Sequence, residues 1–278
     1  MRVHFGGSSR QSLEIARAKL DAAVKGATQE RAAALSSELF FVAEVLGGAI
    51  SLRRAITDPS RDADSKIALV SDLFRKSLDS VTLQLVSDIS TLRWSSSGDL
   101  IPVIEQLAIE AEASAAIISN ELDRVEDEFF AASRAVADSF ELRKALLSLG
   151  AEPAKTALVE DLLGEGRSAS TIKLMTHLVK DLRGRSIEAA FADYFYALAA
   201  RRDRMIAHVR VAVEMSATQR ERLVSALTKE MGQPVRVNIE VDPTVIGGMS
   251  VKFADELVDG TVSHRLAQAG RGLVGQNA

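Results

Sequence analysis

The chain has 278 residues, 47% hydrophobic and 26% charged, which is typical of a globular protein with one large or two modest domains. A net charge of −4 without a concentrated basic region argues against a nucleic-acid partner, whose phosphates require a positive surface. The absence of cysteine excludes disulfides, thiolate metal sites and a cysteine nucleophile, and it agrees with a reducing cytoplasm.

The first hundred residues predict a series of amphipathic helices. Leu13, Ala16 and Leu20 recur at helical spacing after Ser9, a residue type that caps helices, and Gly26 is a C-terminal stop. Asp58-Pro59 interrupts the helical pattern, because proline removes a donor and restricts the residue before it. Further helices are predicted from the Thr28 cap to Gly48, and over 52–57, 66–77 and 80–94.

The segment from Asp99 to Ser139 has a longer uninterrupted helical pattern than the rest. Apolar residues recur there in steps of three and four, Asp99 can cap the segment, and Pro102 lies in its first turn. Between Pro102 and Ser139 the segment contains no glycine or proline. We interpret the segment as one long helix, straight or kinked, that ends one bundle and begins another.

An internal repeat supports a division of the helical region. Four pairs of segments match in order at an offset of 89 or 90 residues, which predicts a duplication. The pairs are 38–41 with 128–131, 52–56 with 142–146, 66–73 with 155–162, and 92–93 with 182–183. We therefore predict a first bundle over 1–105 and a second over 106–204.

After Arg201 the hydrophobic period changes from helical to alternating. Strands are predicted at 209–213, 235–241 and 249–253, with a helix behind a Ser216–Gln219 capping box. A final helix is expected to carry Val262, Leu266, Ala269 and Leu273. The fold class predicted is mainly α with a small α+β domain: duplicated helical bundles, then a βαββα domain over 205–278.

Ordered motifs in this last part resemble the delta subunit of F-type ATP synthases, the family that includes the oligomycin-sensitivity-conferring protein. They are Val211-Ala212-Val213, Ser216-x-x-Gln219, Val241-Asp242-Pro243-x-x-Ile246-Gly247-Gly248 and Val258-Asp259-Gly260-Thr261-Val262-x-x-Arg265-Leu266. The resemblance covers roughly residues 105–275, and the additional N-terminal copy resembles the long actinobacterial form.

The resemblance implies a non-catalytic peripheral-stalk subunit with two partners. The helical part would hold N-terminal segments of alpha subunits through Leu13, Ala16 and Leu20, or through their second-copy equivalents Ala115, Ile118 and Leu122. The C-terminal domain would hold the end of the b subunit through Val262, Leu266, Ala269 and Leu273. The expected location is the cytoplasmic face of the cell membrane, reached through the complex.

The residues themselves indicate no reaction chemistry. Gly247-Gly248 lacks the spacing and the lysine of a phosphate-binding loop, and the four histidines lack metal-ligand spacing, so no cofactor, nucleotide or metal site is expected. Most carboxylates are interpreted as solvated groups on polar helix faces. No segment reaches the ~20 apolar residues that span a bilayer. The competing interpretation is a helical scaffold or regulator unrelated to ATP synthase.

Overall fold

A computed structural model describes residues 5–147, 152–164, 166–204, 206–232, 235–242, 245, 248–253 and 256–259. The chain divides into two compact units, 1–199 and 200–278. The helices in chain order before the sheet are α1 (Gly7–Val24), α2 (Gln29–Gly48), α3 (Ile50–Thr57), α4 (Ala63–Phe74), α5 (Ser80–Ser90), α6 (Leu100–Ile118), α7 (Leu122–Asp138), α8 (Phe140–Leu147), α9 (Glu152–Leu163), α10 (Ala169–Lys180) and α11 (Ile187–Arg204).

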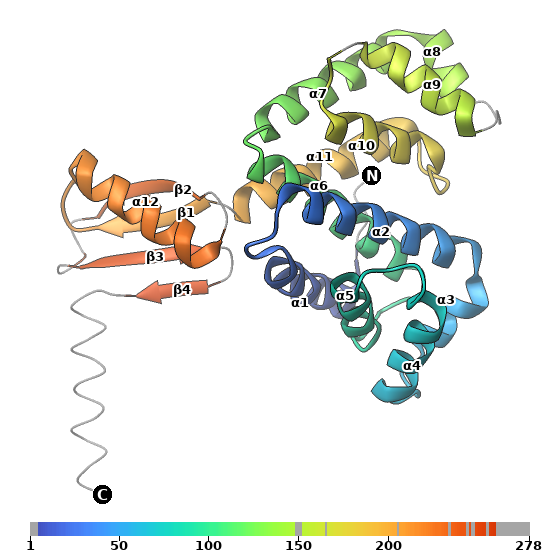
Figure 1. Ribbon diagram of the computed structural model, residues 1–278, viewed down its shortest axis with the longest axis horizontal. Helices are drawn as coiled ribbons and strands as arrows, with labels where there is room; N and C mark the ends of the chain where they lie inside the picture. Colours follow the sequence, from blue (N-terminus) through green and yellow to red (C-terminus); the bar gives the residue numbers. More distant parts are fainter. Residues whose placement is uncertain are drawn as a thin grey trace, which may run out of the picture. The chain divides into compact units, whose positions relative to one another are not determined.

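Helix α6 is the centre of the helical unit. It lies between the group α1–α5 and the group α7–α11 and contacts α1, α2, α7 and α10 (Figure 1). Every residue of α6 except Pro102 and Ile118 is buried. A helix that is buried around its whole circumference needs other helices to cover all its faces, and here two groups of helices do so.

The prediction of one helix from Asp99 to Ser139 is wrong, because the chain breaks between α6 and α7. Asn120 adopts a left-handed conformation with φ of 58°. The N–H of Glu121 donates to the carbonyl of Ala116 at 2.7 Å, and the N–H of Asn120 donates to that of Ile117 at 3.0 Å. This is the Schellman pattern of helix termination, with asparagine in the position that glycine usually takes.

The predicted helix caps are confirmed at two positions and wrong at two others. Thr28 accepts from the N–H of Arg31, and Ser216 and Gln219 form a complete capping box. Asp99 occupies the N-cap position of α6 but makes no capping bond, because its carboxylate accepts a hydrogen bond from the Ser9 hydroxyl at 2.7 Å. Ser9 itself is inside α1, whose N-cap is Gly6.

Each of the two groups of helices contains the same kind of polar contact. In the first, the Glu38 carboxylate of α2 accepts from the Asp79 N–H at 3.1 Å and from the Thr82 hydroxyl, at the start of α5. In the second, the Glu128 carboxylate of α7 accepts from the Ser168 N–H at 2.9 Å and from the Thr171 hydroxyl at 2.7 Å, at the start of α10. We call these the glutamate clasps.

Each clasp fixes the angle between two helices that are far apart in sequence. The carboxylate satisfies an N–H at a helix start that would otherwise lack a partner, and its charge is favourable at the positive end of the helix dipole. Burial raises the pKa of Glu128, but the hydrogen bonds from Thr171, Ser168 and Arg124 outweigh it and leave the pKa below its ordinary value.

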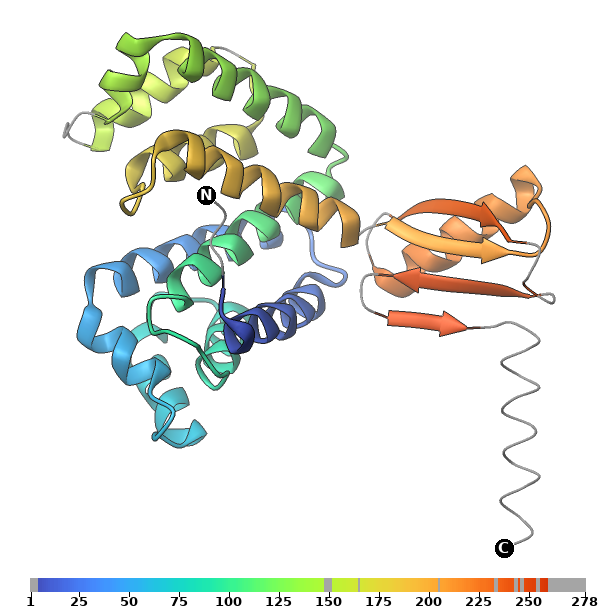
Figure 2. The same cartoon turned by 180° about the vertical axis from the view of Figure 1, so that it is seen from behind.

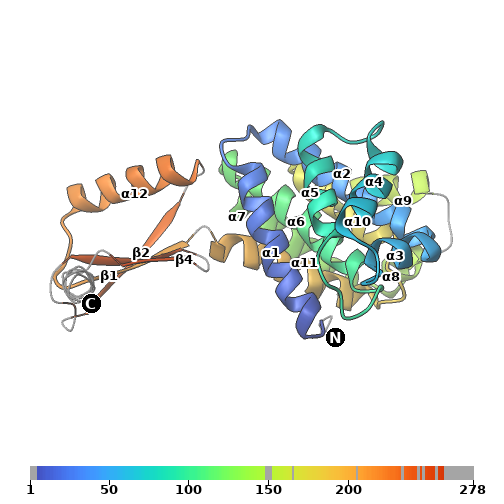
Figure 3. The same ribbon diagram turned by 90° about the horizontal axis from the view of Figure 1, so that it is seen from below.

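The second unit is a small mixed sheet with one helix on it. Its elements are β1 (Ile206–Val211), α12 (Ala217–Met231), β2 (Arg236–Val241), β3 (Met249–Phe253) and β4 (Glu256–Asp259). The strand order is β2-β1-β3-β4, with β1 parallel to β2 and antiparallel to β3 (Figure 2). Alternate residues Ala207, Val209 and Val211 enter the core, and α12 covers that face (Figure 3).

Details of this unit differ from the sequence prediction. Strand β4 was not predicted. Val213, expected to continue the first strand, is 72% exposed, because β1 ends at Val211, whose carbonyl accepts from the Asp242 N–H. The predicted final helix with Val262, Leu266, Ala269 and Leu273 is outside the described residues, so it stays a prediction.

We expect Asn120→Ala to destabilise the helical unit by about 1 kcal/mol, because a Cβ-bearing residue without a polar side chain is strained in the left-handed conformation. Asn120→Gly should match or exceed the wild type. Urea unfolding monitored by circular dichroism measures both, and equal stability of the alanine and glycine variants would contradict this account of the break.

Glu128→Gln should lower the free energy of unfolding at pH 7 by roughly 2 kcal/mol, the value of hydrogen bonds to a charged group. Because the folded pKa of Glu128 is depressed, its stabilisation is complete above the unfolded pKa of about 4.3 and is lost as pH falls through the folded value. The difference from wild type should therefore shrink in acid. Asp127→Asn, at the neighbouring exposed carboxylate, is the control and should change stability little at either pH.

Candidate partner-binding site

The residues predicted to face the alpha subunits lie mostly inside the helical unit. Leu13, Ala16 and Leu20 on α1 are at most 4% exposed, and Ala115 and Leu122 are also buried, whereas Ile118 is half-buried. In the described fold they supply the core of the bundles. A partner of α1 would therefore first contact the exposed residues beside them, such as Ile15 and Ala18.

A groove on the surface runs between α1 and α5. We define the α1/α5 groove by its lining residues and assign it a volume of about 380 Å³. The lining residues of the groove are Lys19, Ala22, Ala23, Ser80, Val81, Gln84, Leu85 and Asp88. Figure 3 shows the two helices side by side. Ala22 is exposed and Ala23 and Val81 are half-buried, so small apolar side chains form an accessible floor.

The groove continues into a smaller hollow at the start of α5. Ala23 and Val81 line both, and the hollow adds Ala27, Ala34 and Leu35, among other residues. Alanine on both walls lets a further backbone approach closely, which is what a docked helix requires.

The charges along this surface are already paired. Lys19 Nζ lies 2.7 Å from Asp88 Oδ2, and Arg31 lies 3.2 Å from Asp79 Oδ1. The backbone N–H of Val81 donates to Asp79 and lowers the pKa of this carboxyl group. Paired charges around small apolar residues suit the docking of a protein segment, and they supply no free acid, base or nucleophile for a reaction.

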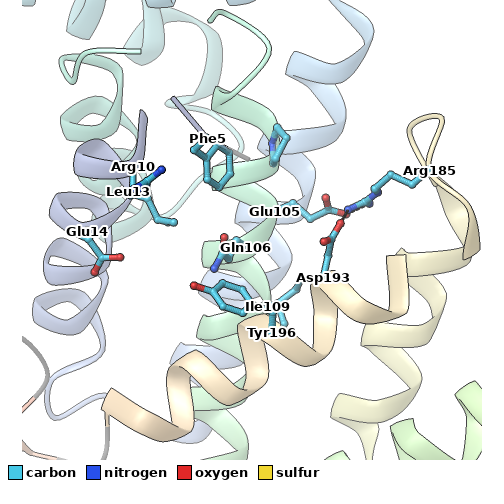
Figure 4. Close-up of a pocket in the computed structure, with 11 residues that line it drawn as sticks. Phe5, Arg10, Leu13, Glu14, Glu105, Gln106, Ile109, Arg185, Asp193 and Tyr196 are labelled. Carbon is cyan, nitrogen blue, oxygen red and sulfur yellow. Dashed lines mark hydrogen bonds and ion pairs between the residues drawn. The ribbon is translucent and has the colours of Figure 1, made fainter. Parts of the chain in front are cut away.

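A second cavity of about 330 Å³ lies in the seam between α1, α6 and α11 (Figure 4). Its polar wall contains the buried Glu105, which accepts from Arg185 at 3.0 Å. Arg185 also donates to Asp193 at 2.9 Å. The Tyr194 hydroxyl lies 3.5 Å from Glu105, and burial together with that carboxylate raises the pKa of the phenol well above its ordinary value.

A second buried ion pair joins α1 to α6 beside this cavity. Arg17 donates from Nε to Glu110 Oε1 at 2.8 Å, and its Nη1 lies 2.7 Å from Glu14. Burial opposes the charge of Arg17, but Glu110 outweighs it and the pKa of the guanidinium is raised. The seam is thus a set of mutually neutralised charges that ties helices together, and we assign it a structural role.

The buried ion pairs of this seam and the α1/α5 groove were not predicted from the sequence. Most carboxylates were predicted to be solvated, whereas Glu105, Glu110 and Glu112 are buried within α6. The signal was present: these three residues interrupt a segment that is apolar on every side, so they could not all face water. The α1/α5 groove was not predicted, because periodicity alone does not show which helices lie side by side.

Two further properties of the described residues bear on function. Among the described residues, no group of three or more histidine, aspartate or glutamate side chains is placed to hold a metal ion. In the same part of the chain no single helix has the length and apolar content to span a bilayer. Helices α2 and α3 reach both criteria together, but they are bent by 108° at their junction.

Comparison with known proteins identifies the family. Residues 110–273 match the sequence model of the ATP synthase delta (OSCP) subunit. The chain belongs to the ATP synthase delta (OSCP) family. This family is a non-catalytic subunit of the ATP synthase complex, which excludes the interpretation as an unrelated helical scaffold.

Two relatives share nearly the whole length of the chain. "ATP synthase subunit delta" of Streptomyces coelicolor is 41% identical over 96% of this chain and 97% of its own length. The protein of the same name from Thermobifida fusca is 39% identical over 97% of this chain and 99% of its own. The segment ahead of the family match is therefore present in these relatives too.

One solved structure is also similar. It is a chain from the "Cryo-EM structure of Toxoplasma gondii mitochondrial ATP synthase hexamer", 21% identical, covering 60% of this chain and 97% of that one with a TM-score of 0.29. A likeness of this size carries no argument about function.

We expect Arg17→Met to destabilise the helical unit by about 3 kcal/mol, because it leaves Glu110 as a buried charge without its cation. Adding Glu110→Leu should recover a large part of that loss, since replacing both members of a buried pair with apolar groups is often neutral. Thermal and urea unfolding of the single and double variants measure this, and an additive loss would contradict the pairing.

Proposed function

We propose that this chain is a stator subunit of the peripheral stalk, linking the alpha/beta catalytic head of ATP synthase to the b subunit. Family membership over nearly the full length is the observation that carries the proposal. Rotary catalysis requires that the head does not turn with the rotor, so a link must bind tightly at two places. Two compact units of different fold provide two different surfaces for this task.

The helical unit is suited to transmit torque because its central helix is held on several sides. Buried ion pairs join α6 to α1, to α10 and to the segment ahead of α11. Such pairs are costly to separate, since breaking one leaves an uncompensated buried charge. Resistance to relative movement of the helices is the property that a stator needs, and it requires no reacting group.

The proposed partners are those that the sequence resemblance implied. N-terminal segments of alpha subunits would dock on the helical unit, for which the α1/α5 groove is the accessible surface. The C-terminal end of b would dock on the second unit. Its predicted contacts at Val262, Leu266, Ala269 and Leu273 are outside the described residues. As part of this complex the chain would lie at the cytoplasmic face of the cell membrane.

We also propose that the helical unit arose by duplication. Helices α1–α6 and α6–α11 have the same order and similar lengths: 18, 20, 8, 12, 11 and 19 residues against 19, 17, 8, 12, 12 and 18. The two glutamate clasps lie at corresponding places, which supports the proposal. On this reading α6 serves as the sixth helix of one half and the first of the next, so the predicted boundary at residue 105 falls inside a shared helix.

Affinity capture from detergent-solubilised membranes tests the linking role. The tagged full chain should retain alpha, beta and b subunits, whereas a chain ending at residue 199 should retain alpha and beta and lose b. Retention of b by the shortened chain would contradict the assignment of partners to units. Absence of all three from the full-chain eluate would overturn the stator function itself.

A further inference from the structure

The cavity in the seam between α1, α6 and α11 has the size and the mixed lining of a small-molecule site. Its volume of about 330 Å³ is at the lower end of the range for such sites. Phe5, Leu13 and Ile109 give it an apolar wall. Figure 4 shows Arg10 reaching toward this space from α1, Gln106 from α6 and Tyr196 from α11.

The three carboxylates that line the cavity are all held by arginines. Arg185 donates to Glu105 at 3.0 Å and to Asp193 at 2.9 Å. Glu14 lies 2.7 Å from Arg17. A cationic ligand would therefore have to displace an existing ion pair, so the lining does not favour a cation.

Arg10 differs from the other arginines of this seam. It is exposed and lines the cavity, but no described residue forms a hydrogen bond or an ion pair with its guanidinium group. Glu14, one turn later on α1, is paired with Arg17 instead. The cation that remains available to a ligand thus lies next to the apolar wall, and a guanidinium group binds carboxylates well.

Gln106 adds a polar group that is nearly buried. Its side chain belongs to a residue only 9% exposed, and its Nε2 donates to Glu110 Oε1 at 3.3 Å. An amide has two N–H donors and a carbonyl acceptor, and the carbonyl has no partner among the described residues. Because buried polar groups are normally hydrogen-bonded, this amide is suited to bind a polar group of a ligand.

We propose that the cavity binds a small monocarboxylate that has an apolar body and a second polar group such as a hydroxyl. Arg10 binds the carboxylate, Phe5, Leu13 and Ile109 contact the body, and Gln106 accepts a hydrogen bond from the hydroxyl. A dianion such as phosphate is disfavoured by the carboxylates in the same wall. The ligand would contact α1, α6 and α11 together, so its binding should stabilise the folded helical unit. The site goes beyond the stator function and does not depend on it.

Three related compounds test the site by isothermal titration calorimetry on the full-length chain. 4-Hydroxyphenylacetate has all three features and should bind saturably, with a dissociation constant of about 1 mM or lower. Its uncharged amide, 4-hydroxyphenylacetamide, should bind about tenfold more weakly, because it loses the charge-assisted hydrogen bond. Phenylacetate, which lacks the hydroxyl, should also bind more weakly than the hydroxylated acid.

Two substitutions assign these differences to residues. Arg10→Gln should weaken binding of 4-hydroxyphenylacetate by about tenfold and leave binding of the amide unchanged, since only the acid uses the guanidinium charge. Gln106→Leu should remove the preference for the hydroxylated acid over phenylacetate, with circular dichroism as the check that this variant is folded. Arg54→Gln, at an exposed arginine of α3, is the matched control and should bind all three compounds like the wild type.

Thermal unfolding provides a second readout that does not depend on heats of binding. The melting temperature of the wild type should rise with 4-hydroxyphenylacetate and should not rise with the same concentration of inorganic phosphate. Absence of saturable binding, equal affinity of the wild type for the acid and the amide, or wild-type affinity in Arg10→Gln would overturn the site. Equal stabilisation by phosphate would do so as well. Each of these results leaves the stator function standing, because affinity capture tests it separately.

Discussion

The helical unit depends on α6, a buried helix that places three glutamate side chains in the interior of the unit. Glu105, Glu110 and Glu112 of α6 are at most 4% exposed, and each has a cation from a different part of the chain. Arg17 comes from α1, Lys173 from α10, and Arg185 from the segment before α11. An apolar helix alone could rotate or slide between its neighbours at small cost, whereas three buried ion pairs specify a single register, because any other register leaves carboxylates unpaired.

This constraint explains how two groups of helices form one unit. Because α6 is shared, the first group does not end where the second begins, and both pack on the same helix. The break at Asn120 then allows α7 to leave the axis of α6 and to build the second group. The glutamate clasps repeat the same solution in each group, where a carboxylate holds the start of a helix some forty residues further along the chain.

Sharing a helix also brings the two groups into direct contact. Because α6 serves both groups, α2 of the first group comes against α10 of the second, where the Phe40 ring stacks on the His177 imidazole and Lys180 pairs with Glu44. The α1/α5 groove of the first group keeps small side chains at the surface.

Much of this protein followed from its sequence, because the signals were local. The Thr28 cap, the Ser216–Gln219 capping box and the glycine stop at Gly26 involve hydrogen bonds or backbone angles within a few residues. The mainly helical class, the small mixed domain and the family resemblance rest on such signals and on periodicity.

Tertiary structure decided the rest, because burial depends on residues far apart in the chain. Asp99 had the pattern of a cap, but Ser9, ninety residues away, took its carboxylate. Leu13 and Leu20 had the pattern of either a core or a docking face, and only the position of α6 assigned them to the core. Periodicity shows which residues share one side of a helix. Which neighbour covers that side is set by the packing of the whole chain, and that packing decides where a partner can bind.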